Sequence, residues 1–241
     1  MAPSTERPNL AHPDSSTIRS LFNAISDQYD FLNSFLSFGL EAFWRKQLVR
    51  EALRGFRCDS ILDLGAGTGK SLNIFLKAHS FRYAAGCDFS DRMLQKAKER
   101  LGDSAVLVAG DFHELPFPDG SFDLVTGSFI LRSVQDMNRF LSEAKRVLRK
   151  GGRVVFLELT RPRNPFVWQY VYQPYLKFYI PFSGKLFSRH KNAYQFLSQS
   201  IQVFPDPEQL KTDFESAGFK HVSLKPLSFG AVTIIAGTAH E

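Results

Sequence analysis

Three glycines, Gly65, Gly67 and Gly69, follow the short predicted strand that ends in Ile61-Leu62-Asp63-Leu64. Glycine lets the backbone adopt left-handed conformations and come close to a ligand, and the N–H groups of such a turn can donate hydrogen bonds to it. A helical pattern begins at Ser71. The arrangement predicts a strand, a glycine-rich turn that holds a ligand, and a helix. A tight turn with no ligand is the alternative.

Acidic side chains stand where the next two predicted strands end. Asp88 ends the second strand, where a carboxylate can accept hydrogen bonds from both hydroxyls of a ribose. Asp111 follows the third strand and could accept from an adenine amino group, with Phe112 against the ring. Each acid by itself is more commonly a solvated residue. Together they predict a nucleoside-binding crevice, because the carboxyl ends of parallel strands meet at one edge of the sheet.

The spacing of the glycines separates three classes of ligand. A phosphate-binding loop of the form GxxxxGK[ST] would need its first glycine at Leu64, and a dinucleotide-binding GxGxxG would need one at Lys70. The sequence has GxGxG, which methyltransferases place around the amino-acid end of S-adenosylmethionine. We therefore predict S-adenosylmethionine as the cofactor. Its predicted binding residues are Gly65, Gly67, Thr68, Gly69, Asp88, Asp111, Phe112 and Ser128.

The fourth predicted strand ends in Gly127-Ser128-Phe129. Methyltransferases that act on exocyclic amines often carry a [DNS]-PP-[YFW] motif at this place. Because no proline stands here, methylation of amines, including those of nucleic-acid bases, is disfavoured.

Strands alternate with helices along the chain, which predicts a parallel, doubly wound sheet. Strands are predicted over residues 60–64, 83–88, 105–109, 122–126, 153–159, 222–226 and 231–236, with helices from 71, over 91–101, over 138–148 with its end at Gly151-Gly152, and over 207–217. The predicted fold class is α/β, a Rossmann-like class I methyltransferase. Its seven-stranded, mostly parallel sheet has helices on both faces.

The length of 241 residues suits one domain with a large core. We expect a disordered tail over residues 1–14 and a single methyltransferase domain over 15–241. Residues 15–55 read as an N-terminal helical cap with a break near Gly39. The two cysteines have no metal-ligand spacing, so no metal site is predicted. The sequence shows neither a signal peptide nor an apolar run long enough to span a bilayer.

An insertion over residues 160–205 carries the whole basic surplus of the chain. The net charge is +6, and this segment has no acidic residue, six basic residues and twelve aromatic residues. Pro174 and Pro181 predict short helices joined by turns. Nucleic-acid binding is one interpretation of this composition, and an aromatic core with a solvated basic rim is another. We favour a substrate lid at a membrane surface, since aromatic and basic residues suit the lipid headgroup region.

The sequence resembles the ubiquinone/menaquinone biosynthesis C-methyltransferases, the UbiE/MenG family, over about residues 21–238. The resemblance is carried by residues 22–30 with Asn33, Ser37, Gly39 and Trp44, by Leu115-Pro116-Phe117 and Phe122-Asp123, and by residues 146–152 with Glu158. Departures from the family pattern are Glu41 for histidine, Lys70 for an acid, Lys150 for proline, Thr160 for serine, and Ile130-Leu131-Arg132-Ser133 for Gly-Leu-Arg-Asn.

The resemblance implies a methyltransferase that uses S-adenosylmethionine to methylate a ring carbon of a polyprenylated quinol in respiratory quinone biosynthesis. The acceptor would be demethylmenaquinol, 2-polyprenyl-6-methoxybenzoquinol, or both. The implied location is cytoplasmic, peripheral on the inner face of the membrane, with no nucleic-acid partner. The oligomeric state is left open between a monomer and a homo-oligomer. Methylation of another small hydrophobic acceptor is a second hypothesis, and a non-catalytic cofactor-binding assembly protein is a third.

Carbon methylation needs an electron-rich ring carbon, which a hydroquinone supplies once a ring hydroxyl loses its proton. Positioning of the two partners then provides much of the catalysis. We predict Arg132, Tyr29 and Asp30 as catalytic residues: Arg132 would hold the phenolate or orient a water, and the other two would cover the site. For all three, an ordinary surface or ion-paired role is the alternative.

Overall fold

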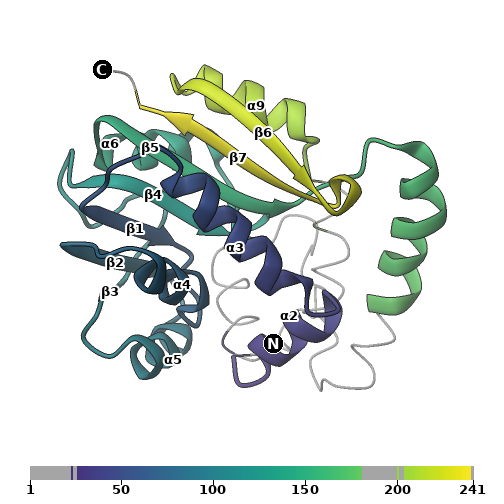
Figure 1. Cartoon of the computed structure of the whole chain (residues 1–241), viewed down its shortest axis with the longest axis horizontal. Helices are drawn as coiled ribbons and strands as arrows, with labels where there is room; N and C mark the ends of the chain where they lie inside the picture. Colours follow the sequence, from purple (N-terminus) through teal and green to yellow (C-terminus); the bar gives the residue numbers. More distant parts are fainter. Residues whose placement is uncertain (1–22, 24–25, 181–199, 201–203, 240–241) are drawn as a thin grey trace, which may run out of the picture.

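The computed structural model describes residues 23, 26–180, 200 and 204–239 (Figure 1). One seven-stranded sheet runs in the order β3-β2-β1-β4-β5-β7-β6. The pairs from β3 to β5 are parallel, and β7 is antiparallel to both β5 and β6. The strands are β1 (Ser60–Leu64), β2 (Tyr83–Asp88), β3 (Val106–Ala109), β4 (Phe122–Ser128), β5 (Leu148–Leu159), β6 (Lys220–Leu227) and β7 (Val232–Thr238). The predicted fold class is confirmed.

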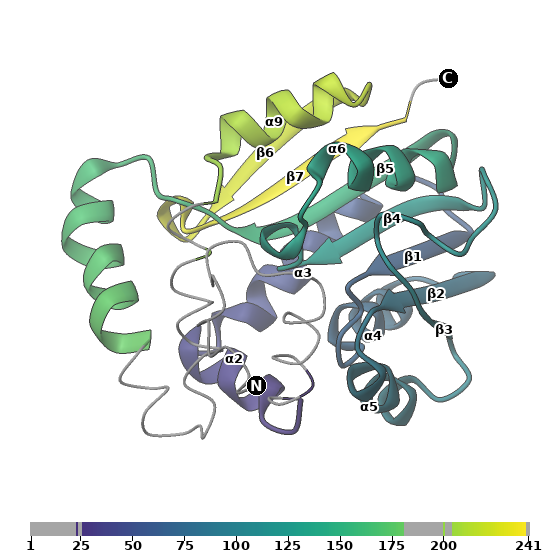
Figure 2. The ribbon, with the colours of Figure 1, turned by 180° about the vertical axis from the view of Figure 1, so that it is seen from behind.

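Helices cover both faces of the sheet (Figures 1 and 2). The helices α3 (Leu40–Leu53), α4 (Lys70–Ala78) and α5 (Asp91–Leu101) share one apolar cluster on one face. The helices α6 (Met137–Val147) and α9 (Pro207–Ser216) share the cluster on the other. Because β1 lies between two covered faces, all five of its residues are buried.

Side-chain caps fix where several of these helices begin. Ser90 accepts a hydrogen bond from the backbone N–H of Met93, and Asp136 accepts one from Arg139. Asp206 caps α9, with Pro207 at its first position. Such caps satisfy N–H groups that the first helical turn leaves unpaired.

The N-terminal cap consists of α2 (Tyr29–Leu36) and α3, separated by a turn at Gly39 with φ +77°. The predicted break near Gly39 is therefore confirmed. The cap is described from residue 26 onward, apart from residue 23. The predicted tail over residues 1–14 lies outside the described residues.

The insertion contains a helix over residues 165–180 with two π-type segments, η2 (Val167–Tyr172) and η3 (Tyr175–Tyr179). We call it the aromatic helix. The predicted break at Pro174 is wrong, because Gln173 and Pro174 both have helical backbone angles. Pro174 lies at the junction of the two π-type segments, where the hydrogen-bond register changes, and the missing N–H is tolerated there. Pro181 and residues 182–199 lie outside the described residues.

The predicted end of α6 at Gly151-Gly152 is also wrong. The helix ends at Val147, and β5 begins at the next residue. The pairing of β5 with β4 shifts between Phe122 and Leu124. Gly151 has φ +71°, and a Cβ at Gly152 would lie 2.8 Å from a backbone oxygen, so both glycines serve this irregularity of the strand. Within the described residues, no helix has the length and apolar character needed to cross a membrane.

Candidate active site

The glycine turn lies between β1 and α4, and its three glycines have φ values of +63°, +54° and +77°. These left-handed conformations strain other L-residues. A Cβ at Gly65 would lie 2.0 Å from the side chain of Ile130, so this glycine is required by packing. A Cβ at Gly67 would meet only a backbone oxygen at 3.8 Å. The turn is therefore tightly packed at its start and has open space at Gly67, where a ligand fits.

The carboxylate of Asp88 lies at the end of β2 and is tied to this turn. Its Oδ2 accepts a hydrogen bond of 2.8 Å from the N–H of Gly67, and its Oδ1 accepts one of 2.9 Å from Ser90. Burial raises the pKa of Asp88 to about 6, against the lowering effect of these backbone hydrogen bonds. Each carboxylate oxygen can accept a further bond, so Asp88 can fix the loop and also bind the hydroxyls of a ribose.

Asp63, inside β1, is a candidate site residue that our sequence analysis missed. Its side chain is 1% exposed, and among the described residues neither carboxylate oxygen has a hydrogen-bond partner. Burial raises its pKa to about 7, while the positive charge of Arg45 has the opposite effect. An unpartnered buried carboxylate is costly unless a ligand completes it. The available signal was an acid at an interior position of an otherwise apolar strand.

Thr68 and Ser128, both predicted to bind the cofactor, are buried at the same edge of the sheet. The two Oγ atoms of Ser128 and Ser71 lie 2.8 Å apart, which joins the end of β4 to the first turn of α4. The hydroxyl of Thr68 contacts the N-terminal cap, donating to Asp30 Oδ1 over 2.7 Å. Thr68 is thus placed to fix the cap on the glycine turn.

Asp111 and Phe112 lie just beyond the end of β3. The carboxylate of Asp111 accepts bonds from the backbone and the ring of His113, which lower its pKa although partial burial opposes this. Phe112 is buried, with edge-on contacts to Phe89 and Phe140. Core packing therefore accounts for most of the Phe112 ring surface, and contact of either residue with an adenine stays a prediction.

The three predicted catalytic residues come from two segments distant in sequence. Arg132 follows β4 and donates from Nε to Glu158 Oε1 over 2.6 Å. Glu158, 1% exposed, also accepts from the N–H of Leu159. The guanidinium is thereby held at one edge. Its Nη2 donates to the Phe129 carbonyl over 3.3 Å and its Nη1 to the Ser200 hydroxyl over 3.5 Å, and each of these nitrogens carries a second N–H group.

Tyr29 is the first residue of α2 and precedes Asp30, whose carboxylate accepts from Thr68 of the glycine turn. Burial raises the pKa of its hydroxyl, while the charges of Arg45 and Arg132 lower it and that of Asp88 raises it. Tyr172 of the aromatic helix is buried near the same ion pair, since Arg132 and Glu158 both influence its pKa, which burial raises. The cap and the aromatic helix thus converge on the end of the sheet that carries the glycine turn.

Asp30 belongs to an ionic network rather than standing free in the site. Its carboxylate pairs with Arg100 of α5 over 2.6 Å and accepts from Thr68. Lys70 donates to its backbone oxygen and also pairs with Glu41. Glu41 and Lys70 are two of the departures from the family pattern, and they pair with each other, while Glu41 also pairs with Arg45. Lys70 is the first residue of α4, where the helix dipole disfavours a cation, and Glu41 offsets that charge.

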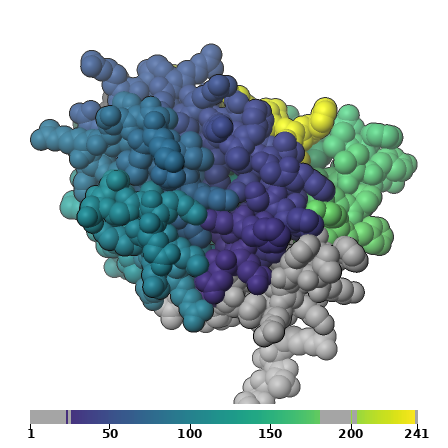
Figure 3. Space-filling view, turned by 60° about the horizontal axis from the view of Figure 1, so that its bottom comes forward, coloured from purple at the N-terminus to yellow at the C-terminus, as the bar shows by residue number. Residues whose placement is uncertain are grey.

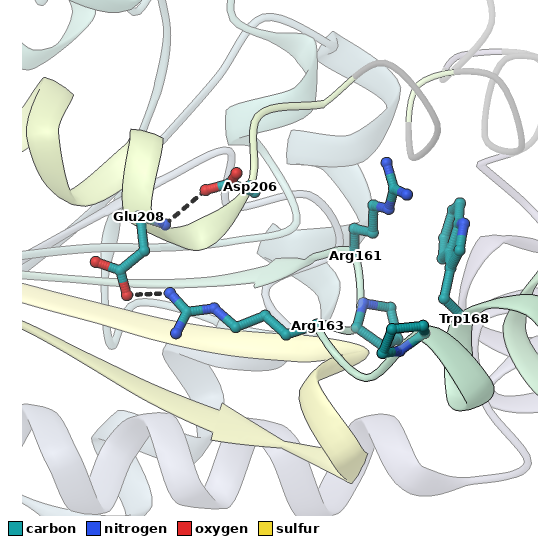
Figure 4. A pocket seen from close by; sticks show the side chains of 7 residues that line it. Arg161, Arg163, Trp168, Asp206 and Glu208 are labelled. Atoms are coloured by element: carbon teal, nitrogen blue, oxygen red, sulfur yellow. Dashed lines mark hydrogen bonds and ion pairs between the residues drawn. The ribbon is translucent and has the colours of Figure 1, made fainter.

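A separate hollow of about 620 Å³ lies between the start of the aromatic helix and α9 (Figure 4). Arg163 pairs there with Glu208, and Arg161 stacks over the Trp168 ring at 4.5 Å. The backbone N–H of Glu208 donates to Asp206. None of the predicted site residues lines this hollow, so it is not part of the candidate site.

The residues at the edge of the sheet fit a ligand with an ammonium group and a ribose. Asp63 offers an unpartnered buried carboxylate, Gly67 leaves open space, and Asp88 has capacity for hydroxyl groups. S-adenosylmethionine contains both groups. Among the described residues, no group of three potential metal ligands comes together.

The family model described as the ubiE/COQ5 methyltransferase family matches residues 11–239. A demethylmenaquinone methyltransferase of Thermotoga maritima is 40% identical over 217 residues, which cover 90% of this chain and 93% of that protein. One from Staphylococcus aureus strain JH9 is 40% identical over 224 residues, covering 91% and 92%.

A phosphoethanolamine N-methyltransferase of Haemonchus contortus, solved in complex with S-adenosyl-L-methionine, aligns with a TM-score of 0.65 at 16% identity. The alignment covers 91% of this chain and 60% of that one. This likeness concerns the fold, whereas the sequence matches concern the family. The protein is an S-adenosylmethionine-dependent methyltransferase, and it belongs to the ubiE/COQ5 methyltransferase family.

Proposed function

We propose that this chain methylates a ring carbon of a polyprenylated quinol in respiratory quinone biosynthesis. The observation that carries the proposal is that α2 and the aromatic helix meet beside the glycine turn: Asp30, the neighbour of Tyr29, accepts a hydrogen bond from Thr68, and Leu32 and Leu36 pack with Tyr172. Arg132 follows β4 and is held by Glu158. The rings of Tyr29 and Tyr172 and the guanidinium of Arg132 suit an aromatic acceptor with phenolic oxygens. The relatives named demethylmenaquinone methyltransferase support demethylmenaquinol as the acceptor. A 2-polyprenyl-6-methoxybenzoquinol is the second candidate, favoured by the family resemblance.

S-adenosylmethionine, when bound, supplies a methyl group attached to a positively charged sulfur. The quinol would lose a hydroxyl proton to water, so that its ring carbon becomes electron-rich enough to bond to the methyl group. As that carbon–carbon bond forms, the methyl–sulfur bond breaks and the sulfur leaves as a neutral thioether. The proton on the methylated ring carbon would then pass to water, which restores the aromatic ring. Arg132, held at one edge by Glu158, can stabilise the phenolate with its remaining N–H groups. Glu158 fixes the orientation of that guanidinium.

The Tyr29 hydroxyl is protonated at neutral pH, because its ordinary pKa of 10 lies well above 7 and burial raises that pKa further. Tyr29 therefore acts in this proposal as a hydrogen-bond donor to the quinol oxygen and not as the base. Asp30 holds α2 on the glycine turn through Thr68 and Arg100. Its contacts favour a positioning role over the catalytic role expected from the sequence.

The proposed acceptor has a prenyl tail that stays in a bilayer, so the protein would work as a peripheral enzyme on the cytoplasmic face of the membrane. Withdrawing the tail into water would cost about 0.8 kcal/mol for each methylene group. A homo-oligomer stays a prediction, which light scattering at several protein concentrations would test.

The deciding experiment is incubation with methyl-labelled S-adenosylmethionine and reduced demethylmenaquinone or the demethylated benzoquinol, followed by mass analysis of the products. We expect label on a ring carbon of the naphthoquinol. The Gly67→Asp variant, in which a carboxylate enters the open space of the turn, serves as the inactive control. Labelling of neither quinol, with intact cofactor binding, would remove the proposed function.

A further inference from the structure

Two turn tips present phenylalanine rings to solvent from left-handed backbone conformations. Phe229, between β6 and β7, has φ +59° and is 88% exposed. Phe38, between α2 and α3, has φ +52° and is 68% exposed. A bulky residue with positive φ is uncommon, and such strain tends to occur where function requires it. Neither the backbone nor the core accounts for an exposed phenylalanine at the β6–β7 tip.

The tips are joined by the tyrosines of the aromatic helix. Tyr175 donates to the carbonyl of Leu36 over 2.8 Å, and Tyr172 donates to that of Ala231 over 3.4 Å. The Phe38 ring stacks on Tyr179 at 4.9 Å. The β6–β7 tip, the α2–α3 turn and the aromatic helix consequently lie side by side on one side of the molecule (Figures 1 and 3).

Trp44 of α3 completes this connection. Its indole N–H donates to the Ser228 hydroxyl over 2.9 Å, which fixes the base of the β6–β7 tip against the cap. Phe43, the neighbour of Trp44, is half exposed. Phe178, next to Tyr179, is more exposed still, at 72%. We name Phe38, Phe43, Phe178 and Phe229 the docking face.

The charges beside the docking face are basic. Lys46 and Arg50 follow Phe43 along the exposed side of α3, and Lys177 precedes Phe178. The acidic residues of α2 and α3 are Asp30, Glu41 and Glu51, and each is in an ion pair. The aromatic helix has no acidic residue. Among the described residues these cations are in no ion pair, and aromatic tips beside them match the headgroup region of an anionic lipid bilayer.

We propose that the docking face inserts into the surface of a lipid bilayer, with Phe229 as its principal anchor, so that the acceptor quinol enters the site from the membrane. This inference deepens the proposed function and rests on it for the identity of the quinol. The anchoring residues would then lie largely outside the run of lysines and arginines in the insertion. The association would have an apolar component that salt does not remove.

The test is co-sedimentation with vesicles of phosphatidylcholine, alone and mixed with phosphatidylglycerol. Phe229→Asn is the main variant, because asparagine tolerates the left-handed conformation better than phenylalanine. We expect vesicle binding to fall at least about tenfold, in line with the loss of one buried aromatic side chain. The melting temperature should be unchanged or higher. A residue needed only for packing would instead lower it.

The controls separate the ring from the charge and from general apolarity. Val106→Ser removes an exposed apolar residue from β3, at the far edge of the sheet, and should leave binding unchanged. Lys177→Gln should weaken binding only to the phosphatidylglycerol mixture at low salt. Phe43→Ser is the second variant of the docking face. If both phenylalanine variants bind like the parent, or if only Lys177→Gln has an effect, the proposal is overturned.

Two acceptors distinguish this proposal from the proposed function. A water-soluble quinol with no prenyl tail should be methylated equally by the parent and by Phe229→Asn, and a vesicle-embedded polyprenylated quinol far more slowly by the variant. If Phe229 governs vesicle binding but neither quinol is methylated, the proposed function fails and the docking face stands. If both quinols are methylated at parental rates by Phe229→Asn, the docking face fails alone.

Discussion

The cofactor side and the acceptor side of this methyltransferase are assembled in different ways. The cofactor side is formed by the ends of β1, β2 and β4, with the glycine turn fixed by backbone hydrogen bonds to Asp88. The acceptor side, as we propose it, is formed by α2, the aromatic helix and the β6–β7 tip, which lie far apart in the sequence. Tyrosine hydroxyls on backbone carbonyls and one small apolar cluster join these three elements.

The difference indicates how the two sides respond to change. The cofactor turn is embedded in the sheet, so that substitutions there act through space and charge at fixed positions. The acceptor side is joined by tyrosine hydrogen bonds, each of which contributes about 1 kcal/mol, and by the apolar cluster that includes Leu36, Tyr172 and Leu176. Substitutions there should therefore have smaller effects than those in the glycine turn.

The largest effect is expected for Gly67→Asp on the cofactor side. The turn has room for the side chain, and aspartate tolerates a positive φ better than most residues. The added carboxylate would occupy the space of the cofactor and repel the carboxylate of S-adenosylmethionine. Calorimetric titration should show a loss of S-adenosylmethionine affinity of more than about 100-fold, since several charged hydrogen bonds are lost together. Parental affinity with an intact fold would show that the cofactor lies elsewhere.

Arg132 lies where the two sides meet, and changing it should lower turnover by about 100-fold, as for loss of an oxyanion-stabilising donor. Arg132→Lys is the suitable variant, because Arg132→Ala would leave Glu158 buried and unpaired. Cofactor affinity should stay within a few-fold of the parent. Single-turnover kinetics measure the chemical step, and an equal fall in cofactor affinity would make Arg132 a structural residue.

Asp88→Ala should weaken S-adenosylmethionine binding by about 10- to 100-fold, the range for loss of a hydrogen bond to a charged group. Part of the lost affinity would come from the glycine turn, because the Gly67 N–H, which donates to Asp88 in the parent, would lose its acceptor. Asp88→Asn keeps one acceptor oxygen and should lie between the two. Calorimetry on all three proteins gives the order, and equal affinities would contradict the role of Asp88.

A pH effect should distinguish Asp63. Because its native pKa is raised from 3.8 to about 7, the native state binds a proton that the unfolded chain has released. The free energy of unfolding of the cofactor-free protein should therefore fall as the pH rises from the ordinary pKa of 3.8 to the native pKa of about 7. Cofactor affinity should rise over the same window, by up to about tenfold per pH unit, because the charged carboxylate binds the ammonium group. Asp63→Asn should make both profiles shallower in thermal denaturation and titration calorimetry, and the slope that remains would come from Asp88, whose pKa is raised to about 6.

The smallest effect is expected for Tyr175→Phe, which removes one hydroxyl from the seam of the acceptor side. The free energy of unfolding should fall by about 0.5–1.5 kcal/mol, and KM for the quinol should change a few-fold without a change in cofactor affinity. Tyr170→Phe, on the exposed side of the same helix, is the matched control. Equal behaviour of the two variants would mean that the seam does not hold the acceptor side closed.

Much of the cofactor side was determined by the sequence alone, because it depends on local chemistry. The spacing of Gly65, Gly67 and Gly69 requires a left-handed turn wherever the chain goes next, and an acid at the end of a strand stays at that end. The alternation of strands and helices was likewise sufficient for the fold class. The sequence did not indicate Asp63, because only the packing of the described residues leaves its carboxylate without a hydrogen-bond partner.

The acceptor side was decided by tertiary structure. Nothing near Asp30 in the sequence indicates that Arg100 and Thr68 would meet it, or that Glu41 would meet Lys70. The rule that proline breaks a helix failed at Pro174, and glycine as a helix end failed at Gly151, because π-type turns and a strand irregularity used these residues instead. Contacts between distant segments depend on how the layers pack, and local residue preferences do not encode that packing.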